Sequence, residues 1–102
     1  MRSMTPADVH AIDGAVIVDV REPREHEQAH VEGTIDIPLG ELVARIDEVP
    51  RDTTVYVLCH VGGRSAQAAQ YLEGNGFDAV NVTGGILAWY RAGLPVVMGD
   101  AD

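Results

Sequence analysis

Residues 54–65 read TVYVLCHVGGRS and predict three kinds of local structure in succession. The apolar and β-branched run at 54–58 is typical of a strand. The glycines at positions 62 and 63 allow the positive-φ backbone of a sharp turn. The stretch from Ser65 to about Glu73 then predicts a helix, which the glycines after it end. A strand, a turn and a helix in this order predict one unit of an α/β domain.

The sequence on either side of this unit alternates in the same way. Strands are expected at residues 15–18, 35–37 and 79–82, and helices at residues 6–13, 23–29, 41–49 and 86–91. The run at 15–18 is apolar throughout, which is typical of a strand buried on both faces of a parallel sheet. The alternation predicts a layered α/β domain with a mostly parallel sheet.

The composition limits the classes of function. The chain has 102 residues, of which 46% are hydrophobic and 23% charged, so we expect a single domain over residues 1–102. A net charge of -9 repels nucleic acid phosphates and anionic lipids, so neither is an expected partner. No long apolar stretch follows the first residues, and one cysteine cannot form an internal disulfide. We therefore expect a cytoplasmic protein without a membrane span.

Cys59 stands where the strand at 54–58 ends and the glycine turn begins. A turn that opens a helix directs several backbone N–H groups at one point, and they stabilise an anion there. A thiolate held in this way is a nucleophile. The alternative is a small buried residue that ends a strand, but the glycine-rich context favours the nucleophile. Asp19 ends the strand at 15–18 and should lie at the same edge of the sheet, where parallel sheets bind ligands.

Four motifs follow one another along nearly the whole chain. They are VDVRE at 18–22, HVEG at 30–33 leading to Ile37 and Pro38, CHVGGRS at 59–65, and the glycine pair at 84–85 followed by Trp89, Gly93 and Pro95. With these motifs the chain resembles the rhodanese-like sulfurtransferases in their compact single-domain form. The resemblance implies a three-layer domain with a mostly parallel central sheet of four to five strands flanked by helices. It also implies that Trp89 packs the last helix against the sheet.

The resemblance implies a double-displacement reaction at Cys59. The thiolate takes a sulfane sulfur from a small donor such as thiosulfate, becomes a persulfide, and passes the sulfur to a thiophilic acceptor. Acceptors of this class are thiols, cyanide or a protein. The loop amides would hold the outer sulfur, and the loop consists of His60, Val61, Gly62, Gly63, Arg64 and Ser65. No metal and no organic cofactor are required.

The residues around Cys59 have alternative roles. Arg64 adds positive potential for an anionic donor, or is a solvated arginine in the first turn of a helix. Ser65 caps that helix or donates its hydroxyl group towards the sulfur. His60 lines the entrance or is an exposed loop residue without a role. For Asp19 and Arg21 we favour a structural pair beside the site over direct catalysis.

Two other enzyme classes share part of these patterns. Cysteine phosphatases also join a cysteine to an arginine through a glycine-containing loop, but they place the arginine one position later than Arg64, so a phosphatase is disfavoured. Residues 26–30 match the His-Glu-x-x-His pattern of zinc proteases. The helix expected there is short and charged and ends before Gly33, so we interpret the match as coincidence and predict no metal site.

A non-enzymatic module of the same fold is the remaining alternative. Such a module would carry sulfur only when docked, sense redox state, or bind a partner. The intact Cys59 and the complete loop disfavour an inactive domain. The acidic surface suits a basic partner, although a solvated acidic exterior is the simpler explanation.

Overall fold

Strands and helices alternate along the chain, as the sequence predicts. The computed structural model describes residues 1–99. In chain order the elements are β1 (Arg2–Met4), α1 (Pro6–His10), β2 (Val16–Asp19), α2 (Pro23–Gln28), β3 (Ala29–His30), β4 (Ile35–Asp36), the 3-10 helices η1 (Leu39–Glu41) and η2 (Ile46–Glu48), β5 (Val55–Leu58), α3 (Gly63–Gly74), β6 (Ala79–Val82), α4 (Gly85–Arg91) and β7 (Val97–Met98). Among residues 1–99, none of the helices has the length and apolar character that crossing a membrane requires.

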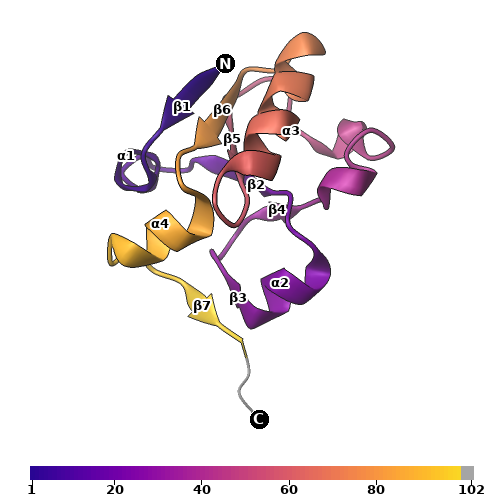
Figure 1. The fold of residues 1–102 in the computed structure, drawn as a ribbon. Coiled ribbons are helices and arrows are strands. Elements are labelled where there is room, and N and C mark those ends of the chain that lie inside the picture. The colour runs from indigo at the N-terminus through magenta and orange to yellow at the C-terminus, as the bar shows by residue number, and fades with distance from the viewer. Residues whose placement is uncertain (100–102) are drawn as a thin grey trace.

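Five strands form one parallel sheet in the order β1-β6-β5-β2-β4, which confirms the predicted sheet (Figure 1). The central strand β5 is buried along its whole length. It pairs with β2 so that Leu58 lies opposite Asp19. Since both strands end at this register, the segments that follow them begin side by side at the carboxyl edge of the sheet.

Helices cover both faces of the sheet and give the predicted three layers (Figure 1). Because side chains of a strand alternate between faces, each central strand contributes to two hydrophobic clusters. One cluster joins the sheet to α3 through Ala68, Ala69 and Leu72. The other joins it to α1 and α4 and contains Val9, Ile86 and Trp89. Trp89 is 2% exposed, so its predicted packing between the last helix and the sheet is confirmed.

The α-helix predicted at residues 41–49 is wrong. This segment runs from the last residue of the 3-10 helix η1 through turns into the 3-10 helix η2. Leu42 is buried in the core, but Val43 is 65% exposed, so the apolar residues do not share one helix face. The backbone N–H groups of Leu42 and Val49 bond three residues back, to Leu39 and Ile46, rather than four residues back.

Three short strands do not appear in the sequence-based prediction. β1 is an edge strand that pairs only with β6, and its residues are largely exposed. β3 and β7 form a separate antiparallel pair of two residues each, which joins α2 to the segment after α4. These strands are defined by their pairing, and they have no hydrophobic pattern of their own from which the sequence could predict them.

Candidate functional site

Cys59 lies between the end of β5 and the start of α3, as the sequence predicts. Gly62 has φ 108°, in the left-handed region, and its N–H donates a hydrogen bond of 3.0 Å to the Sγ of Cys59. Gly62 is also the N-cap residue of α3, which begins at Gly63. Because an α-helix stabilises negative charge at its N-terminus, this end of α3 favours a thiolate at position 59.

Ser65 and Asn81 continue the polar contacts of the sulfur inside the protein. The thiol of Cys59 donates to the Oγ of Ser65 at 3.2 Å. The hydroxyl group of Ser65 donates to the Oδ1 of Asn81 at 2.5 Å, and the carbonyl of Gly62 is a second acceptor at 3.2 Å from the same oxygen. Both Ser65 and Asn81 are buried. The sequence-based prediction missed Asn81, although a lone polar residue in the buried run of β6 is the signal that would have found it.

Cys59 is buried although part of its own loop is exposed. Cys59 is 1% exposed, whereas Val61 in the same loop is 57% exposed. The thiol is therefore buried, as in the alternative that the sequence left open, while its Sγ also accepts the Gly62 N–H bond that favours a nucleophile.

Gly85 fastens the start of α4 to the loop. It has φ 62°, and a Cβ atom there would overlap the carbonyl oxygens of Cys59 and His60. The next two N–H groups of α4 donate to these same carbonyls, Ile86 to Cys59 at 2.8 Å and Leu87 to His60 at 3.1 Å. Only glycine permits this approach, so the glycine pair at 84–85 fixes one side of the site.

Asp19 and Arg21 form the buried pair that the sequence predicts. Two nitrogens of the Arg21 guanidinium group donate to the carboxylate, Nε at 3.1 Å and Nη2 at 2.9 Å. The same guanidinium donates to the carbonyls of Glu25 and Ala29, at 3.3 and 2.7 Å. Arg21 thus holds the middle of α2 and the residue that follows it beside the end of β2, which agrees with a structural role.

Arg64 makes an ion pair that the sequence-based prediction did not include. Its two terminal nitrogens donate to both carboxylate oxygens of Glu25 in α2, at 2.6 and 2.8 Å. The side-chain hydrogen bond from Arg64 lowers the pKa of Glu25 to about 2, and the same bond raises the pKa of Arg64. Both groups are therefore ionised at neutral pH. The pair bears on the predicted role of Arg64 because a carboxylate now offsets its positive charge.

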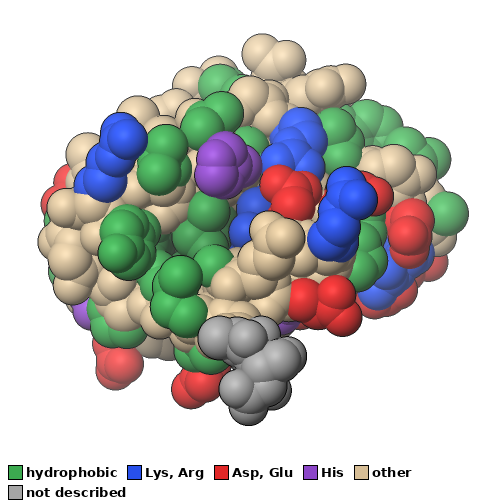
Figure 2. All heavy atoms as spheres, turned by 60° about the horizontal axis from the view of Figure 1, so that its bottom comes forward, with side chains coloured by type: hydrophobic (Ala, Val, Ile, Leu, Met, Phe, Trp, Pro, Cys, Tyr) green, Lys and Arg blue, Asp and Glu red, His purple; other side chains and the backbone are tan. Residues whose placement is uncertain are grey.

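A groove of about 290 Å³ lies beside the loop, and His60 lines it. Polar and small residues in and around α2 also line it, namely Arg21, Glu25, Gln28 and Ala29. The rest of the lining comes from α4 and the segment that follows, which present apolar side chains. Figure 2 shows hydrophobic side chains gathered round a hollow next to a histidine and a pair of oppositely charged side chains. His60 is exposed, and its place at this entrance is one of the two alternatives that the sequence left open.

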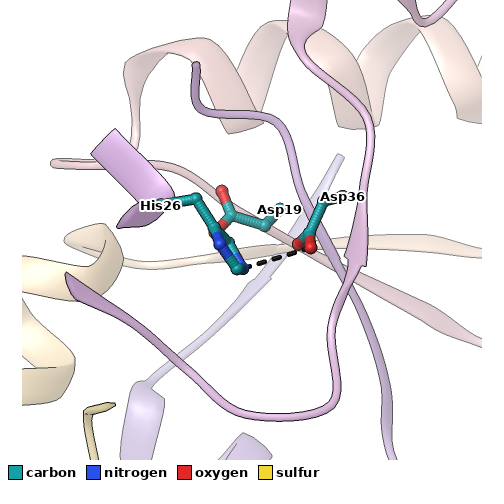
Figure 3. Close-up of side chains that lie close together, drawn as sticks. All are labelled: Asp19, His26 and Asp36. Carbon is teal, nitrogen blue, oxygen red and sulfur yellow. Dashed lines mark ion pairs between the residues drawn. The ribbon is translucent and has the colours of Figure 1, made fainter. Parts of the chain in front are cut away.

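A second polar cluster lies at the carboxyl ends of β2 and β4. Figure 3 shows Asp19, His26 and Asp36 side by side, with one potential ligand atom from each within 4.8 Å of the others. His26 contacts Asp36 through Nε2 at 3.1 Å. However, both oxygens of Asp19 already accept hydrogen bonds from Arg21, so a metal ion would compete with a buried guanidinium.

The zinc-protease pattern at residues 26–30 does not form a zinc-protease helix. α2 ends at Gln28, and His30 belongs to β3. The rings of His26 and His30 stack on each other with centroids 4.2 Å apart, and Nδ1 of His30 faces the carbonyl of His26. The helix thus ends before His30, as the sequence predicts, and the interpretation of this match as coincidence stays a prediction.

Comparison with known proteins agrees with this geometry. The family model described as "Rhodanese-like domain" matches residues 5–92. The chain is 37% identical over 83 residues to the thiosulfate sulfurtransferase GlpE of Vibrio cholerae, covering 80% of this chain and 78% of that protein. It is 43% identical over 74 residues to the putative sulfur carrier protein YrkF of Bacillus subtilis, covering 72% of this chain and 40% of that protein. The crystal structure of a rhodanese-related protein from Thermoplasma volcanium superposes with a TM-score of 0.91 at 38% identity, covering 95% of this chain and 98% of that one.

Proposed function

The chain belongs to the rhodanese-like domain family, and on that premise we propose that it is a sulfurtransferase that works through a persulfide on Cys59. The observation that carries the proposal is the position of Sγ, at the N-terminus of α3 and within 3.0 Å of the Gly62 N–H. This environment supports a negative sulfur, which is the form that attacks. The sulfurtransferase relative supports the same class of reaction.

The reaction has two steps that share the covalent intermediate. In the first, the Cys59 thiolate attacks the outer sulfur of a donor such as thiosulfate. A new S–S bond forms at Sγ, the S–S bond of the donor breaks, and sulfite leaves with the electron pair. In the second, a thiol or cyanide attacks the outer sulfur of the persulfide and restores the thiolate. The amides of residues 60–65 and the hydroxyl group of Ser65 would stabilise the negative outer sulfur.

The direct test is whole-protein mass spectrometry after treatment with thiosulfate. We expect the mass to rise by one sulfur atom and to return to its first value when cyanide is added. Cys59→Ser and Cys59→Ala should gain no sulfur and should keep their fold, because neither substitution changes the loop backbone. Sulfur uptake by both variants would contradict the assignment of the nucleophile.

Steady-state kinetics test the double displacement. A covalent intermediate that separates two half-reactions predicts parallel lines in double-reciprocal plots with donor and acceptor varied. Intersecting lines would show that donor and acceptor bind together, and would contradict the two-step scheme.

A sulfur-relay module is the second candidate function, favoured by the similarity to a putative sulfur carrier. Such a module would accept sulfur at Cys59 once and release it only to a protein acceptor. It is distinguished by turnover: loading without repeated release to cyanide or small thiols would favour the relay over the free-standing enzyme.

A further inference from the structure

The groove lies beside residues 59–65, which we call the sulfur loop, and it offers exposed apolar surface. It is lined by Ile86, Leu87, Tyr90, Val96 and Met98, besides the residues of α2 and His60. Tyr90 and Met98 are 60% and 63% exposed. A volume of about 290 Å³ matches the body of a small organic molecule rather than that of a small inorganic anion.

The ionised side chains of the groove are already paired. Arg21 is neutralised by Asp19 at 2.9 Å, and Glu25 by Arg64 at 2.6 and 2.8 Å. Arg64 is the one cation within the sulfur loop, so its pairing leaves the loop without an uncompensated positive side chain. Since the pKa of Glu25 is about 2, this compensation persists throughout the neutral pH range.

Residues of the groove are bonded to both ends of the sulfur loop. Ile86 and Leu87, which line the groove, donate backbone hydrogen bonds to the carbonyls of Cys59 and His60. Glu25, which also lines the groove, forms an ion pair with Arg64 near the other end of the same loop. A molecule whose body occupies the groove therefore lies next to the segment that carries Cys59.

We propose that Glu25 and the apolar groove select the sulfur donor, favouring an organic persulfide with an apolar body over the thiosulfate dianion. This inference rests on the proposed function of Cys59. The thiolate attacks the outer sulfur of R–S–SH, the new S–S bond forms at Sγ, and R–S⁻ leaves with the electron pair of the broken bond. Such a donor carries at most one charge and places R in the groove, whereas thiosulfate brings two charges to a loop whose arginine is already neutralised.

The experiment compares three donors: benzyl persulfide, methyl persulfide and thiosulfate. The measured quantity is kcat/KM for adding one sulfur atom to Cys59, followed by mass spectrometry. We expect benzyl persulfide to exceed thiosulfate by about tenfold or more, a ratio that corresponds to roughly 1.4 kcal/mol. We also expect it to exceed methyl persulfide, which has the same reacting group without a body for the groove.

Two variants with matched controls assign the selectivity to residues. Glu25→Gln keeps an oxygen that accepts from the Glu22 N–H but removes the charge that neutralises Arg64, so kcat/KM for thiosulfate should rise roughly fivefold. Glu27→Gln makes the same change in net charge at an exposed position of α2 and should leave the ratio of donors unchanged. Tyr90→Ala should lower the ratio of benzyl to methyl persulfide, and Tyr71→Ala in α3 is its control.

The outcomes separate this inference from the proposed function. If thiosulfate loads Cys59 as fast as benzyl persulfide and Glu25→Gln changes nothing, the selectivity is overturned while the sulfurtransferase assignment stands. If benzyl and methyl persulfides react equally fast, the groove does not hold the donor body, and that part is overturned. If none of the three donors loads Cys59, the proposed function itself fails.

Discussion

Ser65 and Asn81 form a buried polar pair directly below the sulfur of Cys59. Ser65 accepts from the thiol and donates to Asn81, so its one hydroxyl group links the residue after β5 with a residue of β6. A buried acceptor that loses its donor costs more free energy than the hydrogen bond contributes, whereas removing both partners is nearly neutral. The pair therefore predicts non-additive effects on stability.

Ser65→Ala should lower the free energy of unfolding by about 1–3 kcal/mol because it leaves the buried Oδ1 of Asn81 without a donor. Asn81→Val should cost less, since Ser65 keeps the carbonyl of Gly62 as an acceptor. The double variant should be more stable than the sum of the two losses predicts, by about 1 kcal/mol. Chemical denaturation measures all three, with Ser3→Ala on the exposed strand β1 as control. Strict additivity would show that the two side chains do not act as a pair.

At the residue scale, the sequence predicted Cys59, its loop and the Asp19–Arg21 pair because each is a local pattern. The pairing of Arg64 with Glu25 was not predictable in the same way, since these residues are 39 positions apart and meet only after α2 and α3 have packed. The burial of Cys59 stayed only an alternative for a related reason. Its exposure depends on how tightly the loop closes, which no short sequence pattern specifies.

The contact between α4 and the sulfur loop depends on one glycine. Gly85→Ala would combine a positive φ of 62° with an overlap between Cβ and the carbonyl oxygens of Cys59 and His60. Neither carbonyl can move freely, because each accepts a hydrogen bond from α4. We expect a loss of about 3 kcal/mol in the free energy of unfolding.

The control for this prediction is Gly40→Ala, at a position where a Cβ atom would meet no heavy atom within 4 Å. Its effect should stay within about 0.5 kcal/mol. Thermal and chemical denaturation of the two variants measure the difference. Equal stability of both would mean that α4 is not held against the loop as described.

The ion pair between Glu25 and Arg64 joins α2 to α3 and gives stability that depends on pH. The pKa of Glu25 is lowered from 4.5 to about 2 by Arg64, so the folded protein binds this proton less readily than the unfolded chain. The contribution is therefore complete above about pH 4.5 and is lost as the pH falls towards 2. Because the pair is partly exposed, solvent screening limits it to about 1 kcal/mol.

Glu25→Gln tests this contribution. At neutral pH the variant should be less stable than the original protein by about 1 kcal/mol, and the two stabilities should converge as the pH falls from about 4.5 towards 2. Unfolding by denaturant at several pH values gives both curves. A difference that stays constant across this range would assign the loss to packing rather than to charge.

At the scale of elements, the sequence predicted the strands and helices that carry strong apolar patterns. β2, β5 and β6 are buried runs, and α3 begins at a glycine turn and ends at glycines. The segment at 41–49 has a similar apolar content but forms 3-10 turns: Leu42 and Val49 are buried in the core while Val43 is 65% exposed, so its apolar side chains do not share one helix face. Pattern alone does not distinguish these two outcomes.

The charge of the whole molecule acts on any anion that approaches Cys59. The net charge is -9, and the radius of gyration is 12.5 Å. At an ionic strength of about 0.01 M the Debye length is roughly 30 Å, so every charge of the protein contributes to the potential at the loop. At about 1 M it is roughly 3 Å, and only contacts such as that between Glu25 and Arg64 remain. The local pair and the overall charge can therefore be separated by salt.

Alkylation of Cys59 makes this separation without assuming any enzymatic activity. Iodoacetate is an anion and iodoacetamide is neutral, and both react with the same buried sulfur, so the ratio of their rate constants reports the potential at Sγ. We expect iodoacetamide to be favoured at low salt, and this preference to fall about threefold or more between roughly 0.01 and 1 M salt as the net negative charge is screened. Glu25→Gln should reduce the preference at low salt, because Arg64 would then attract the anion. A preference for iodoacetate at low salt in the unaltered protein would mean that Arg64 dominates the potential despite its partner, and it would argue for an anionic donor.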